Sequence, residues 1–95
     1  MDKIGDLINK NVMEMLLTLG IKNDMPIMMD YWMESKKGKV IIGLKDNEKI
    51  LVKNEEEYTS PIKNIYKSDD HLIILTENSI YLVYNNIKAK HIKTN

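Results

Sequence analysis

Cysteine and arginine are both absent from this sequence of 95 residues. Without cysteine the chain can form no disulfide, no thiolate metal site and no cysteine nucleophile. Because small secreted domains often carry disulfides, a cytoplasmic setting is expected. All 14 basic residues are lysines and 14 acidic residues balance them, whereas nucleic-acid binders usually show a basic excess that includes arginine. Nucleic acid is therefore not an expected partner.

Long apolar runs are also missing. No stretch approaches the ~18 consecutive apolar residues of a membrane span. Residues 1–6 hold no basic stretch followed by an apolar run, so no signal peptide is expected. The four glycines are isolated and form neither a G-x-G-x-x-G motif nor a phosphate loop, so no cofactor is expected. The length fits one domain over residues 1–95.

An amphipathic helix is the clearest element, and the spacing predicts it over residues 3–19. Asp2 is a plausible N-cap, and Gly20 stands where a left-handed residue would end the helix. The apolar stripe repeats with the helical period of 3.6 residues. Its members are Ile4, Leu7, Ile8, Val12, Met15, Leu16 and Leu19.

The segment from 27 to 35 fits two interpretations. Alternation of Ile27, Met29, Tyr31 and Met33 favours a strand that turns into the next one at Gly38. A short helix that ends near the same glycine fits almost as well. The hairpin is narrowly preferred, and the β-rich part of the chain is expected to span residues 27–92.

Short apolar segments rich in β-branched residues follow at close spacing and predict strands. They cover residues 40–44, 49–52, 62–66, 71–76, 79–84 and 87–92. A helix followed by such a run indicates an α+β protein, with the helix packed on an antiparallel meander of about five to six strands. The sheet is either open or curled into a barrel.

The later strands are apolar on both faces. Leu72 and Ile74 alternate with Ile73 and Leu75, whereas a sheet with one wet face alternates apolar with polar residues. One helix covers only one face of such a sheet. We therefore expect the second face either to close on itself in a barrel or to meet another chain, which could be a second copy.

Two groups of residues are candidates for contact with a protein partner. The first surrounds Trp32, the only tryptophan, and aromatic and Met side chains are enriched at interfaces. It comprises Met28, Tyr31, Trp32 and Met33. The second is an acidic run with its neighbour, and charge of this kind steers encounter with a basic partner. It comprises Glu55, Glu56, Glu57 and Tyr58. Core packing of Trp32 and a solvated loop are the competing interpretations.

Catalytic and metal chemistry find little support. Asp69, Asp70 and His71 contain metal-ligating types, but a turn followed by a strand explains them, and a site needs three or four converging ligands. Ser60 and Ser79 show no nucleophile context. We expect neither an enzyme nor a metal site.

The strand start Thr59-Ser60-Pro61 and the hairpin from Thr76 to Tyr81 resemble a pattern of small β-rich proteins encoded by phages. In those proteins a Thr-Ser-x-Val/Ile strand start precedes a Thr-x-Asn-Ser-x-Tyr hairpin. The resemblance covers residues 40–84. It implies a phage or mobile-element origin, the cytoplasm of the host cell as the location, and inhibition of host defence by binding, as anti-CRISPR proteins do.

We therefore expect a small binding protein that inhibits a host factor, such as a CRISPR or other defence component, by protein–protein contact. One alternative is an oligomer that sequesters a small ligand between subunits. Its site would comprise Thr59, Ser60, Asn78 and Ser79. The other alternative is a structural subunit of a larger assembly.

Overall fold

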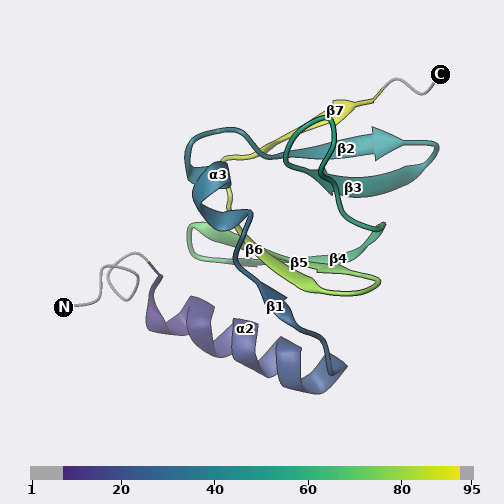
Figure 1. The fold of residues 1–95 in the computed structure, drawn as a ribbon. Coiled ribbons are helices and arrows are strands. Elements are labelled where there is room, and N and C mark those ends of the chain that lie inside the picture. The colour runs from purple at the N-terminus through teal and green to yellow at the C-terminus, as the bar shows by residue number, and fades with distance from the viewer. Residues whose placement is uncertain (1–7, 93–95) are drawn as a thin grey trace.

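The computed structural model describes residues 8–92, which form three layers. Helix α2 (Lys10–Asn23) forms the first layer. The second is the central sheet, with strand order β1-β6-β5-β4, and the third is the small sheet, with order β3-β2-β7 (Figure 1). The strands are β1 (Ile27–Met28), β2 (Ile41–Lys45), β3 (Glu48–Val52), β4 (Ile62–Ser68), β5 (His71–Thr76), β6 (Ile80–Tyr84) and β7 (Lys88–His91). The predicted α+β class with an N-terminal helix on a sheet is confirmed.

Helix α2 has different ends from those predicted. It begins at Lys10, where the side chain of Asn9 accepts a hydrogen bond from the Val12 amide at 3.0 Å. The proposed Asp2 cap and residues 3–7 lie outside the described residues. Gly20 does not end the helix, which continues to Asn23 and is closed by Asp24 in the left-handed conformation (φ 51°).

Close packing, and not a helix end, explains why a glycine stands at position 20. A Cβ at this position would come within 3.1 Å of the side chain of Ile27, which leads into β1. The glycine thus lets the first strand cross the end of the helix at short range.

The central sheet is antiparallel along β4, β5 and β6, as predicted. Its first strand departs from the meander, because β1 pairs in parallel with β6 through Ile27 and Ile80. A meander joins only neighbours along the chain, so this pairing between distant segments was not expected from the sequence.

The small sheet is a hairpin with one added strand. β2 and β3 are joined by a tight turn in which Asp46 and Asn47 both have positive φ (51° and 68°), the type favoured between antiparallel strands. β7 then pairs in parallel with β2 on its other side, with Ile41 opposite Lys88. The predicted strands 40–44, 49–52 and 87–92 thus belong to a separate layer.

The preferred hairpin at 27–38 is wrong. Only Ile27 and Met28 are extended, and residues Trp32–Lys36 form the short helix α3. Two buried contacts hold this helix. The Ser35 hydroxyl accepts a hydrogen bond from the Tyr84 amide at 3.0 Å, and the Trp32 indole donates one to His71. Tertiary contacts therefore decide the conformation of this short segment.

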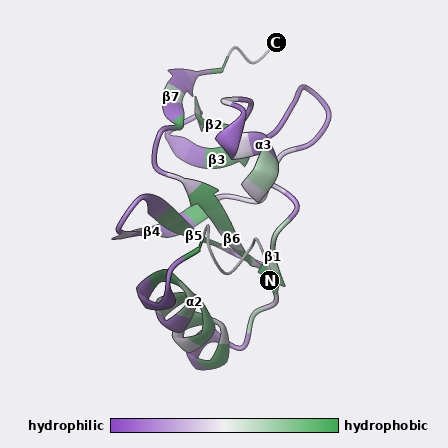
Figure 2. Cartoon of the chain, turned by 90° about the vertical axis from the view of Figure 1, so that its left-hand side faces the viewer, coloured by the Kyte–Doolittle hydropathy of each residue, from purple (hydrophilic) through white to green (hydrophobic). Residues whose placement is uncertain are grey.

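Two hydrophobic cores lie on the two faces of the central sheet. The first joins α2 to Ile73 and Leu82. The second joins Ile74 and Val83 to Leu51 of the small sheet. Figure 2 shows the hydrophobic colouring of β5 and β6 between the other two layers.

Neither expected cover for the second face is correct. The sheet does not close into a barrel, and that face needs no other chain, because the small sheet of the same chain covers it. The apolar residues on both faces of β5 and β6 are thus explained by a buried middle layer.

Candidate functional site

The outer face of the small sheet is the face that points away from the second core. Successive side chains of a strand point to opposite faces. In β3, Leu51 points into the second core, so Ile50 and Val52 point outward. The register places Val52 opposite Ile41 and Ile50 opposite Gly43. An apolar strip therefore remains on the side that no layer covers.

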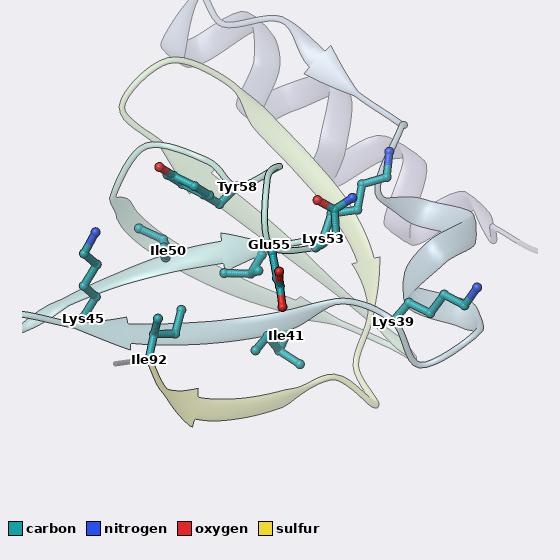
Figure 3. A pocket seen from close by; sticks show the side chains of 10 residues that line it. Lys39, Ile41, Lys45, Ile50, Lys53, Glu55, Tyr58 and Ile92 are labelled. Carbon is teal, nitrogen blue, oxygen red and sulfur yellow. The ribbon is translucent and has the colours of Figure 1, made fainter. Parts of the chain in front are cut away.

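A cavity of about 500 Å³ lies over this strip, and we call it the hollow (Figure 3). Its lining combines an apolar centre with lysines, one acid and one amide. The lining residues are Lys39, Ile41, Lys45, Ile50, Val52, Lys53, Asn54, Glu55, Tyr58 and Ile92. The size falls within the range of ligand pockets.

Gly43 shapes the floor of the hollow. A Cβ built there would overlap Cδ1 of Ile92 and lie 3.1 Å from Cγ2 of Val52. Ile92 is positioned by its backbone amide, which donates to the Leu44 carbonyl at 2.9 Å. The missing side chain at Gly43 thus lets Ile92 lie flat against β2 and complete the apolar lining.

The loop after β3 forms one wall. Asn54 organises it, because its Oδ1 accepts from the amides of Glu56 and Glu57 at 2.8 and 2.9 Å. This Asx-type turn directs Glu55 and Tyr58 to the hollow, and Tyr58 is 58% exposed. A large, exposed aromatic side chain beside an apolar floor is typical of a contact surface.

The lysines of the lining differ in how they are engaged. The ammonium group of Lys53 points away from the hollow. Its Nζ lies 5.5 Å from the ring centroid of Tyr31 and 3.7 Å from a carboxylate oxygen of Glu57. Lys39 and Lys45 stand at opposite ends of the hollow, as Figure 3 shows. The two cationic ends favour negative charge on the partner at those positions, whereas Glu55 in the wall favours a basic group opposite the loop.

Tyr31 lies beneath this region. Burial raises the pKa of its phenol to about 12, and the nearby Tyr81, Asp30 and Glu57 add to the rise. The ring packs edge-to-face on Tyr81 with centroids 5.0 Å apart. The phenol is thus held neutral and acts as a packing group at ordinary pH.

The structure separates the first group of predicted contact residues. Tyr31 and Trp32 are each only 4% exposed and belong to the two cores. Met28 is half-buried in β1, whereas Met33 is 46% exposed on α3. The two aromatic residues are therefore structural in this fold and are not part of the surface proposed below.

The second group lies where a partner can reach it. Glu55 and Tyr58 line the hollow, and Glu56 is exposed in the same loop. Glu57 is engaged within the protein, because its carboxylate accepts a hydrogen bond from the Asn54 side-chain amide at 3.0 Å and forms an ion pair with Lys53. Sequence reasoning thus located one wall of the hollow.

The residues suggested for a small ligand lie close to one another, but their polar groups are hydrogen-bonded within the chain. Asn78 donates to Ser60 at 3.4 Å. The buried Thr59 hydroxyl accepts from the Leu51 amide and donates to the Ser60 carbonyl. The Ser79 backbone bonds to the Thr76 hydroxyl. These contacts stabilise the loops that support β3 and β6.

Sequence reasoning missed the floor of the hollow. Ile50, Val52 and Ile92 were treated only as strand residues, although Ile50, Leu51 and Val52 make β3 apolar on both faces. That pattern was the available signal, but it cannot tell which face is covered.

Residues 8–92 offer no support for two other site types. No group of three or more His, Cys, Asp or Glu side chains converges there as a metal site. No helix in that range is long and apolar enough to cross a membrane. Comparison with protein-family models, with curated proteins and with solved structures gives no match.

Proposed function

We propose that this protein works by binding a protein partner through the outer face of the small sheet, and that the bound partner is thereby inhibited. The observation that carries the proposal is the hollow, which stays open although both cores are complete. Apolar surface left outside a completed core and rimmed by polar residues commonly marks an interaction site.

The composition of the hollow suits a protein interface. Aliphatic side chains, among them Ile50 and Val52, line the hollow together with Tyr58, and Lys39 and Lys45 stand at its two ends (Figure 3). Interfaces generally have this arrangement of apolar core and polar rim. Lys39 and Lys45 would steer a partner with acidic groups toward the apolar centre.

The target is proposed from the resemblance to small phage-encoded proteins. Such proteins act in the host cytoplasm, and the resemblance favours a defence component, for example of a CRISPR system. Inhibition by contact needs no catalytic group on this chain. It needs only a surface that blocks the working face of the target.

A plating experiment tests the proposal. The protein is expressed in bacterial strains that each carry one defence system, and the efficiency of plating of a sensitive phage is measured. We expect the wild type to raise plating at least tenfold in one strain. Ile50→Lys places a charge in the hollow and is expected to return plating to the level of the empty vector.

Ile65→Lys is the matched control, because Ile65 is a 38% exposed strand residue on β4, outside the hollow. It is expected to keep the wild-type effect, and both variants are checked for an unchanged melting temperature. If the wild type does not raise phage plating in any strain, the inhibitory role is contradicted. If a folded Ile50→Lys protein raises phage plating as much as the wild type does, the hollow is not the contact surface.

The volume of the hollow favours one alternative, the sequestration of a small apolar ligand. Native mass spectrometry of the purified protein distinguishes it. A ligand mass that accompanies the wild type and is lost in Ile50→Lys would favour sequestration. The same spectra report whether the protein is a monomer or a homo-oligomer.

A further inference from the structure

We infer that the partner is held as an extra β-strand along β7, and that its side chains alternate between acidic and apolar. This inference rests on the proposed function, since it names the chemistry of the partner that the outer face receives. β7 is the outer strand of the small sheet, and all four of its residues are exposed. No other strand of residues 8–92 lies beside its free edge.

The backbone of β7 leaves hydrogen-bonding groups free at this edge. Ile92 donates its amide to Leu44 of β2. Peptide groups of successive residues point to opposite sides of a strand, so the N–H and C=O groups of Lys88 and Lys90 point to β2, as the Ile92 amide does. The N–H and C=O groups of Ala89 and His91 therefore point to the open side. An extended peptide can bond to them as a strand bonds in a sheet.

The register of β7 sets the side-chain chemistry of the added strand. Lys88 stands opposite Ile41 and Lys90 opposite Gly43, so both lysines lie on the face that carries the hollow. Acidic residues on that face of an added strand would form cross-strand charge pairs with them. No acidic residue occurs in β7 itself.

The other face of the added strand favours apolar residues. Ala89 stands opposite Ile42, which packs against the second core but is only half-buried. Apolar side chains beside Ala89 would extend this core over the exposed part of Ile42. The partner segment thus needs acids at every second position and apolar residues between them.

The edge of β3 is less suited to a new strand. The loop after β3 returns to it, because Val52 pairs with Tyr58 and the Thr59 amide donates to the Leu51 carbonyl at 2.9 Å. At the edge of β4, the register shifts between Ile62 and Asn64, and such irregularities hinder strand addition.

A second copy of this chain is a poor occupant of the β7 edge. Two β7 strands placed side by side would bring lysines against lysines, and like charges in cross-strand contact are destabilising. The lysines thus oppose self-pairing and favour a foreign acidic segment.

Two synthetic hexapeptides test the inference, one alternating Glu and Val and the other alternating Lys and Val. Each carries a fluorophore, and binding to the full chain is measured by fluorescence anisotropy. We expect the Glu peptide to bind at least tenfold more tightly than the Lys peptide. Equal binding of both, or no binding of the Glu peptide at millimolar concentration, overturns the inference.

Ala89→Pro removes one outward N–H without touching the bonds to β2, and edge positions tolerate proline. Ala89→Val is the matched control, because it keeps the N–H and favours a strand. We expect the proline variant to lose at least tenfold in affinity for the Glu peptide and the valine variant to keep it. Equal affinity in both contradicts strand addition.

The double variant Lys88→Glu/Lys90→Glu gives an independent measurement if Ala89→Pro does not fold. It is expected to reverse the preference in favour of the Lys peptide, and an unchanged preference contradicts the inference. The plating experiment separates the two proposals. If Ile50→Lys abolishes the rise in phage plating while folded β7 variants still raise plating, strand addition is wrong and the proposed function stands.

Discussion

The indole Nε1 of Trp32 donates a hydrogen bond to Nε2 of His71 across 3.0 Å in the interior of the protein. Since Nε2 accepts, the ring carries its proton on Nδ1, which faces Oδ1 of Asp70 at 2.8 Å. Tyr84 packs against both rings, with centroids 4.4 Å from His71 and 5.8 Å from Trp32. This contact joins α3 to the central sheet.

His71→Leu is expected to destabilise the protein by about 1–3 kcal/mol, because the buried indole N–H loses its acceptor. Urea unfolding measures the change. Trp32→Phe removes the donor instead, and the double variant is expected to cost less than the sum of the single changes. Additive costs would mean that the two side chains stabilise the fold independently.

Ser35 fastens α3 to β6 in a second way. Its buried hydroxyl donates to the Trp32 carbonyl at 2.6 Å and accepts from the Tyr84 amide at 3.0 Å. Ser35→Ala is expected to lower the free energy of unfolding by about 1–3 kcal/mol, since the Tyr84 amide is left unpaired. Thr18→Ala is the control, because it removes an exposed hydroxyl on α2, and it is expected not to lower the free energy of unfolding, since alanine favours a helix.

Gly43→Ala tests the floor of the hollow. The new methyl group would push Ile92 away from β2, because the two side chains cannot occupy the same space. We expect the efficiency of phage plating with this variant to be at least tenfold lower than with the wild type. The free energy of unfolding is expected to change by less than about 1 kcal/mol. Methyl NMR signals of Ile92 report the displacement. If the Ile92 methyl signals do not shift although the effect on phage plating is lost, the substitution acts elsewhere.

Tyr31 gives the protein a sensitivity to alkali. Its folded-state pKa of about 12 exceeds the ordinary value of 10, so the unfolded chain releases the phenolic proton first as the pH rises. The resulting stability is complete below pH 10 and is lost progressively between pH 10 and 12, by on the order of 2 kcal/mol. Tyr31→Phe is expected to flatten this part of the curve of unfolding free energy against pH. The two curves should run parallel from pH 7 to 9, and an equally steep fall in the variant would assign the alkaline sensitivity to other groups.

The sequence predicted those elements whose pattern is local. The helical stripe identified Val12, Leu16 and Leu19, which are buried under the central sheet. The strand segments were also found, because a strand pattern is read over a few neighbouring positions. The helix end was misjudged because Gly20 serves a packing contact with Ile27 of the next strand, which a helical pattern does not reveal.

The candidate site was only half visible in the sequence, for the same reason. The acidic loop with Tyr58 stood out by composition. The apolar floor did not, because Leu51 and its neighbours Ile50 and Val52 look alike until the layers are assembled. Which of two apolar faces becomes core is decided by packing between segments that are far apart, and α3 depends in the same way on contacts with β5 and β6.

Each sheet takes one strand from the opposite half of the chain, since β1 pairs with β6 and β2 with β7. The partners are roughly fifty residues apart, so the chain must close large loops before either layer is complete, and such closures slow folding. We expect the local hairpins, which need only short loops, to form before β1 and β7 dock. A protease cut between β6 and β7 would therefore release the edge strand from its covalent tether and weaken the small sheet first.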